Sequence, residues 1–256
     1  MNEDRYVEYG AATGIIFVIL SVIGFAVVIP NPPDLNAPAQ DWATYFLNHH
    51  DAVRAGLVIL LVALFFFIWF LGTLTSLLRI ATGTPRLPSI VLIGGILGAA
   101  CLLIGGTAET VAAYRPQGIA DPSITESLND VFLMAGVAAI PAFAAFFAAA
   151  AIVILRTGAF PAWLGWLLVV AAAVQPLTFG TMFTKTGAFA GDGVLGLFVP
   201  FIVSLVAIFA LSALLTAWAR DAARSADMTL TERIRGAAVG AAAGAAAGAR
   251  GERPSQ

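Results

Sequence analysis

Glu109 is the residue whose type and position could do chemistry in this chain. It follows twenty-two uncharged residues, 87–108, and precedes Tyr114 by five positions. A carboxylate without a partner in hydrocarbon is costly, so Glu109 should face other protein segments and hold either a proton or a cation. The sequence therefore predicts a candidate site around Glu109.

Two side chains are candidate partners for this carboxylate. Arg54 stands at the start of the apolar run 55–78, and Gln175 is a neutral neighbour from a later run. Arg115 is nearer in sequence, but it follows Glu109 by six positions and lies on a different helix face. Two interpretations stay open: an inter-helix clamp, or a ligand or proton site made by Glu109, Arg54 and Gln175.

Other reactive side chains do not form a recognisable catalytic or metal-binding pattern. His49 and His50 are adjacent, so on a helix they diverge by about 100°, whereas helical zinc pairs stand four residues apart. Cys101 is the one cysteine and lies in an apolar run, where a small packing residue is the usual role. No HExxH, CxxC, G-x-S-x-G or P-loop pattern occurs. We expect no catalytic residue, no metal and no cofactor.

The composition places the chain in a membrane. Of its 256 residues 60% are apolar and 11% charged, with a mean hydropathy of +0.92. Soluble domains have about 45–50% apolar and about 25% charged residues, so the apolar surplus here must face lipid. The net charge of −2 gives no support for nucleic-acid binding.

Six apolar runs are long enough to cross a bilayer as helices, which takes about 20 residues each. We expect an all-α integral membrane bundle with spans at about 10–29, 55–78, 89–114, 131–155, 162–182 and 194–218. The first run is expected to stay as a helix and not to be a cleaved signal peptide, because its leader is acidic. Residues 1–220 form the transmembrane domain, and the Ala/Gly/Arg-rich residues 221–256 form a disordered tail.

Positive charge sets the expected orientation. Ten arginines fall on the side of the two termini, at positions 5, 79, 86, 156, 220, 224, 233, 235, 250 and 253. The other side holds three cations, Arg54, Arg115 and Lys185. Both termini are therefore expected in the cytoplasm and the chain in the plasma membrane.

An aromatic face is expected in the first outer loop. Trp42, Tyr45, Phe46 and His49 stand at i, i+3, i+4 and i+7, which is one face of a helix. This spacing favours a short helix lying on the outer leaflet, with the aromatic rings at the lipid–water boundary. A plug of aromatic rings over the bundle explains the same spacing equally well.

Small residues and prolines indicate how the helices pack. Gly94 and Gly98 form a GxxxG motif, which lets helix backbones approach closely, and we expect the third span at the centre of the bundle. Pro141, Pro176 and Pro200 interrupt the fourth, fifth and sixth spans.

Residues 155–177, LRTGAFPAWLGWLLVVAAAVQPL, resemble the fifth-span segment of an uncharacterised family of multi-pass bacterial membrane proteins. The matching residues are Arg156, Gly158, Pro161, Trp163, Leu164 and Gly165. The resemblance extends over residues 10–180 and implies no activity and no catalytic residues. Physically, the motif is a cytoplasmic turn followed by an interfacial anchor, Trp163.

These observations favour a non-enzymatic membrane protein, either an accessory subunit or a binder of a small apolar ligand or lipid. The alternative is a small-molecule or ion-coupled transporter that uses Glu109 in an outer-half cavity. The expected partners are the lipid bilayer and either a protein partner or further copies of the chain, with no nucleic acid.

Overall fold

Six long helices make up the structure, a computed structural model that describes residues 3–28, 32–115, 121–224, 232 and 234–240. Each of the six is long and apolar enough to cross a membrane, the fifth when its 3₁₀ continuation to Met182 is included, and the described residues contain no strand. The helices are α1 (Glu3–Val28), α2 (Ala39–Thr82), α3 (Arg86–Tyr114), α4 (Pro122–Thr157), α5 (Ala162–Val174) and α6 (Val199–Arg224). The predicted all-α bundle with six spans is confirmed.

Two spans contain helical segments that are not α-helical. After α5 the chain continues as a 3₁₀ helix, η1 (Gln175–Met182), and α6 is preceded by a π-helical turn, η2 (Val194–Phe198). Pro176 accounts for the end of α5, because it cannot donate a backbone hydrogen bond. Pro141, by contrast, lies inside α4 without ending it.

The aromatic segment of the first loop is not a separate helix. Residues 39–54 form the first turns of α2, which runs without interruption for 44 residues. At about 1.5 Å per residue α2 is far longer than a bilayer's hydrocarbon thickness of about 30 Å. The prediction of a detached short helix was therefore wrong about where this helix begins and ends. Its position relative to a membrane surface stays a prediction.

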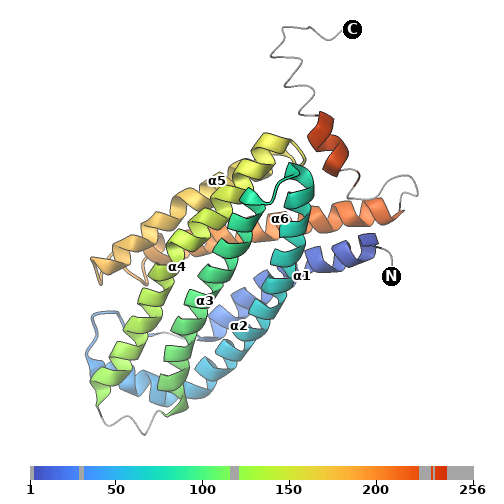
Figure 1. Cartoon of the computed structure of the whole chain (residues 1–256). Coiled ribbons are helices and arrows are strands. Elements are labelled where there is room, and N and C mark those ends of the chain that lie inside the picture. The colour runs from blue at the N-terminus through green and yellow to red at the C-terminus, as the bar shows by residue number, and fades with distance from the viewer. Residues whose placement is uncertain (1–2, 29–31, 116–120, 225–231, 233, 241–256) are drawn as a thin grey trace.

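The centre of the bundle is α4 and not α3. In Figure 1, α3 and α4 run side by side through the middle of the view, with α1 and α2 on one side and α5 on the other. Yet 61% of the most apolar stretch of α4 is buried, against 33% for α3. The GxxxG motif correctly indicated close packing, but of α3 against α4 along one face only. A Cβ added at Gly94 would lie 2.6 Å from the carbonyl oxygen of Ala142.

One end of the bundle carries the short connections, and we call it the arginine end. Here α2 and α4 each finish at a glycine with left-handed backbone, Gly83 (φ 64°) and Gly158 (φ 61°). Each helix has an arginine in its last turn, Arg79 or Arg156, where positive charge stabilises a helix C-terminus. At the same end the Arg220 guanidinium donates to Glu8 at 2.7 Å, joining α6 to α1.

The opposite end holds the start of α2, the end of α3 and the start of α4, and we call it the aromatic end (Figure 1). Asp121 caps α4 here by accepting a hydrogen bond from the Ser123 backbone N–H at 2.9 Å. This hydrogen bond lowers the pKa of the Asp121 carboxyl below its usual value. A second apolar cluster, separate from the main core, fills this end around Trp42, Tyr45 and Phe46.

The predicted disordered tail, 221–256, lies mostly outside the described residues. Residues 234–240, however, are helical. Ile234 is fully buried and belongs to the main apolar core. This part of the tail therefore packs against the bundle, which the glycine-rich sequence did not lead us to expect.

Candidate functional site

Glu109 lies one and a half turns before the end of α3 and is buried, with 7% of its surface exposed. Its place on the helix follows from two glycines of the preceding turn. A Cβ at Gly105 would contact Ala135 and Phe132 of α4, and one at Gly106 would contact Leu57 of α2. Because residues three and four apart share a helix face, Glu109 points between α2 and α4, as predicted for a carboxylate that avoids lipid.

The register of α3 and α4 brings Asn129 to the level of Glu109. Gly94 packs against Ala142, and Gly105 packs against Phe132. Because the two helices are antiparallel, one turn forward along α3 corresponds to one turn back along α4. One turn after Gly105 on α3 is Glu109, and one turn before Phe132 on α4 is Asn129. Asn129 is itself buried, with 5% of its surface exposed.

Aromatic side chains from the first turns of α2 close this end of the bundle. Trp42, Tyr45 and Phe46 are 3%, 8% and 1% exposed. Their rings pack edge to face or tilted, with centroids 5.4–6.4 Å apart. Ala112 and Ala113, which follow Glu109 by three and four positions on α3, belong to the same apolar cluster as these rings. The burial of these three rings favours a plug of aromatic rings over the bundle, rather than a helix with its rings at the lipid–water boundary.

The Glu109 carboxylate lacks the cation that we expected. Its Oε2 atom is buried without a hydrogen-bond partner among the described residues. Arg54 instead donates to Asp51, one turn earlier in α2. The predicted Glu109–Arg54 pair is therefore not formed, because a local partner takes the arginine.

Gln175 is also engaged elsewhere. Its amide Nε2 donates to the Ser204 hydroxyl at 2.8 Å and to the Ala171 carbonyl at 3.2 Å. The Ser204 hydroxyl in turn donates to the Pro200 carbonyl at 2.7 Å. Gln175 thus ties the junction of α5 and η1 to α6, and it makes no hydrogen bond to Glu109.

Three buried polar residues near this end were missed in the sequence. Thr125 and Asn129 stand four apart on α4, which puts them on one face, and that spacing was a readable signal. Thr181 of η1 has a buried hydroxyl without a partner among the described residues. A Cβ added at Gly191 would contact the methyl group of Thr181 together with Leu133 and Leu35, so these side chains pack around Gly191.

The expectation that the sequence holds no dinucleotide-binding glycine pattern was wrong. Gly191, Gly193 and Gly196 form G-x-G-x-x-G. In dinucleotide-binding folds this pattern follows a strand, but here it runs from the connection after η1 into η2, in a part of the chain that is described without any strand. The pattern therefore gives no support for a nucleotide site.

The histidines take structural positions. The His49 ring stacks on Tyr45, with centroids 4.7 Å apart, and its Nδ1 lies 3.0 Å from the Tyr45 carbonyl oxygen. His50 lies 3.6 Å from Asp51. Among the residues that the structure describes, no group of three His, Cys, Asp or Glu side chains could hold a metal ion.

Trp163 lies at the opposite end from Glu109. It occupies the first turn of α5, just after the arginine-end connection, and is 55% exposed. Its role as an interfacial anchor stays a prediction.

No protein-family model matches this chain, and comparisons with curated proteins and with solved structures give no significant match. The resemblance of residues 155–177 to a bacterial membrane-protein family therefore stays a prediction. What the chain does has to be inferred from its own geometry.

Proposed function

We propose that this multi-pass membrane protein binds a small, largely apolar molecule with one cationic group at the Glu109 site, formed by Glu109, Tyr45, Trp42, Phe46 and Asn129. The observation that carries this proposal is the buried Oε2 atom of Glu109, which has no hydrogen-bond partner in the part of the chain that the structure describes. A buried charge is normally paired, because an uncompensated one costs several kcal/mol. A ligand cation would supply the missing partner.

The surroundings of the carboxylate favour a cation with an apolar body. Aromatic ring faces attract cations, most strongly when both are out of water, and three buried rings close this end of the bundle. Apolar walls with a few polar groups are typical of small-molecule sites. Asn129, level with Glu109, offers the neutral hydrogen-bonding group that would fix the orientation of the ligand.

The test compares two probes of the same shape and opposite charge, tetraphenylphosphonium and tetraphenylborate. Equilibrium dialysis with purified protein in detergent should show saturable binding of the cation. Glu109→Gln should weaken that binding about tenfold or more, which is about 1.4 kcal/mol. The matched control, Glu126→Gln, changes a carboxylate of α4 that pairs with Lys185 at 3.8 Å, and should leave binding unchanged. Equal binding of the cation by wild type and Glu109→Gln, or preference for the anion, would contradict the proposal.

Ion-coupled transport is the second candidate function. The observation that favours it is the break in two spans, where 3₁₀ and π segments replace α-helix at η1 and η2. Discontinuous helices are typical of transporter substrate sites. Uptake of the bound cation by proteoliposomes, driven by an imposed proton gradient, would support transport. Binding without gradient-dependent uptake would leave the protein a binder and contradict transport.

The orientation belongs to the same proposal. With both termini in the cytoplasm of a cell, the arginine end faces inward and the Glu109 site opens towards the outer half of the plasma membrane. The support is the distribution of ten cations against three.

A further inference from the structure

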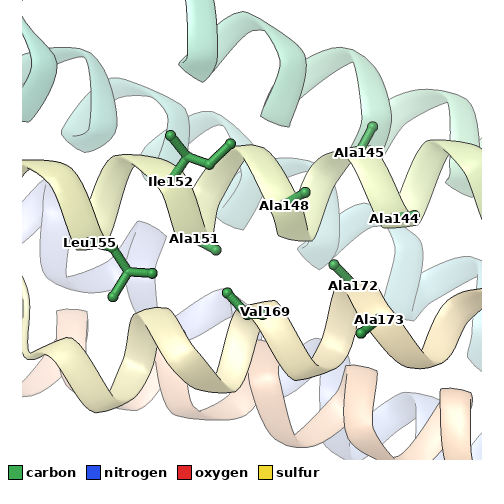
Figure 2. A pocket seen from close by; sticks show the side chains of 9 residues that line it. All are labelled: Ala144, Ala145, Ala148, Ala151, Ile152, Leu155, Val169, Ala172 and Ala173. Atoms are coloured by element: carbon green, nitrogen blue, oxygen red, sulfur yellow. The ribbon is translucent and has the colours of Figure 1, made fainter.

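An apolar groove runs between α4 and α5, away from the Glu109 site. Its volume is about 540 Å³, within the range of about 300–1,000 Å³ that small-molecule sites have. Alanine, valine, isoleucine and leucine side chains line it. In Figure 2 the side chains of Ala151 and Leu155 of α4 and of Val169 and Ala172 of α5 lie between the two ribbons. Whatever fills this groove must be hydrocarbon, because the lining offers it no hydrogen-bonding side chain.

The length of the groove matches one leaflet of a bilayer. Its α4 wall extends from Ala144 to Leu155, which is about 16 Å at about 1.5 Å per residue. The hydrocarbon of a whole bilayer is about 30 Å thick. A helix from a second copy would need a surface of the full thickness, whereas a lipid acyl chain occupies half of it.

A cation stands at one mouth of the groove. Ala148, Ile152 and Arg156 are spaced i, i+4 and i+8 on α4, so Arg156 continues the groove-lining face by one turn. It is exposed and makes no ion pair with any residue that the structure describes. Arg156 therefore lies at the arginine end, free to pair with an anion outside the protein.

On α5, the indole ring of Trp166 lies near the same end of the groove. Trp166, Val169 and Ala173 stand at i, i+3 and i+7, and Trp166 is 62% exposed. Tryptophan prefers the headgroup level of a membrane, where its indole N–H can donate a hydrogen bond. Gly165 packs against Ile154 and Leu155, so the neighbouring Trp166 lies level with the end of the groove and Arg156 lies just beyond it. Apolar walls, then a tryptophan and a cation, thus follow one another along the groove, which matches the acyl chain, interfacial region and headgroup of a phospholipid.

We propose that the α4/α5 groove is a binding site for an anionic phospholipid, with one acyl chain along the alanine-lined walls and the headgroup phosphate on Arg156. The site is independent of Glu109, which lies at the other end of the bundle. Basic residues between transmembrane helices commonly hold anionic lipid headgroups. The groove would then stay filled in the membrane, and the bound lipid would hold α4 and α5 together where their alanines leave space.

Native mass spectrometry of the delipidated full chain tests this site with phosphatidylglycerol and phosphatidylcholine of identical acyl chains. Wild type should bind one phosphatidylglycerol about fivefold more tightly than phosphatidylcholine, since one arginine near the surface contributes about 1 kcal/mol. Arg156→Gln should abolish this preference, and Arg156→Lys should retain it. Arg79→Gln is the matched control, because Arg79 also ends a helix at the arginine end but belongs to α2, which does not line this groove.

A second pair of variants separates the groove from the charge. Ala148→Leu with Ala173→Leu fills the groove and should remove one bound lipid per protein, whichever headgroup is used. Ala55→Leu, an exposed position on α2 outside the groove, should not. Thermal unfolding of each variant in detergent shows that it is folded. Equal affinity of wild type for the two lipids, an unchanged preference in Arg156→Gln, or a wild-type dimer that the leucine pair converts to monomer would each overturn the proposal.

Discussion

Gln175 and Glu109 are both buried polar side chains of the membrane domain, but only one of them is satisfied inside the protein. Gln175 donates two hydrogen bonds, to Ser204 and Ala171, whereas Oε2 of Glu109 has no partner among the described residues. A satisfied polar side chain contributes to stability, while an unsatisfied one opposes it. This difference makes Glu109 a candidate for function and Gln175 a structural residue.

A pair of substitutions tests this difference. Gln175→Leu should lower the free energy of unfolding by about 1 kcal/mol, because it removes the hydrogen bond between Gln175 and Ser204 of α6. Glu109→Gln should cost less than that or raise stability, because it removes an ionisable group that pairs with no cation among the described residues. Thermal unfolding in detergent provides the comparison. A greater loss for Glu109→Gln than for Gln175→Leu would show that Glu109 is an inter-helix clamp after all.

At this scale the sequence predicted which residue to examine but not which residues it meets. A single carboxylate after twenty-two uncharged residues must face protein, and Glu109 does. The predicted pairing of Glu109 with Arg54 was wrong because Asp51 stands three positions before Arg54 on the same helix. Such a local pair forms without any long-range packing. Asn129 becomes visible only once the α3/α4 register is known.

Helix positions followed closely from apolar run length, while helix ends did not. Residues 39–54 extend α2 because nothing in them stops a helix, although they exceed what a bilayer needs. The prediction that α3 lies at the centre of the bundle was wrong because a glycine motif indicates only close packing against one neighbouring helix. It does not report how many neighbours surround the helix.

The glycine contacts of α3 give a prediction for this pair of elements. Gly94→Ala should destabilise the bundle by about 1–3 kcal/mol, because the added Cβ would lie 2.6 Å from the Ala142 carbonyl oxygen and 3.0 Å from the Phe146 backbone nitrogen. Gly136→Ala, on α4 with nothing within 4 Å of the added Cβ, is the control and should show no loss. Thermal unfolding of both variants decides the matter, and equal stability would place α3 and α4 further apart than described.

The tail provides a prediction about a shorter element. Truncation after Gly240 should leave stability unchanged, whereas truncation after Arg224 removes Ile234, which is fully buried in the main core. Burying an isoleucine is worth about 1.5–3 kcal/mol, so the shorter chain should unfold at a lower temperature. Identical unfolding of the two truncated proteins would mean that Ile234 adds nothing to the core.

For the whole molecule, composition predicted a membrane protein, because a chain that is 60% apolar has to place much of its surface in lipid, and the lengths of the apolar runs predicted six spans. The orientation of the bundle in the membrane is predicted from the positions of the arginines, because the packing of the helices is the same in either orientation. Reporter fusions after Glu252 should be active only in the cytoplasm, and fusions at Pro38 only outside it. An exported reporter at Glu252 would reverse the bundle and place Glu109 in the inner half.

Infrared difference spectroscopy of the purified protein tests the central claim, that Glu109 meets a ligand cation, most directly. Adding tetraphenylphosphonium to wild type should shift a carboxyl band, because the environment of the buried carboxylate changes when a cation enters. Glu109→Gln should lack that shift, and Glu126→Gln should retain it. The same carboxyl difference bands in wild type and Glu109→Gln, or none in wild type under conditions where the cation binds, would contradict the account.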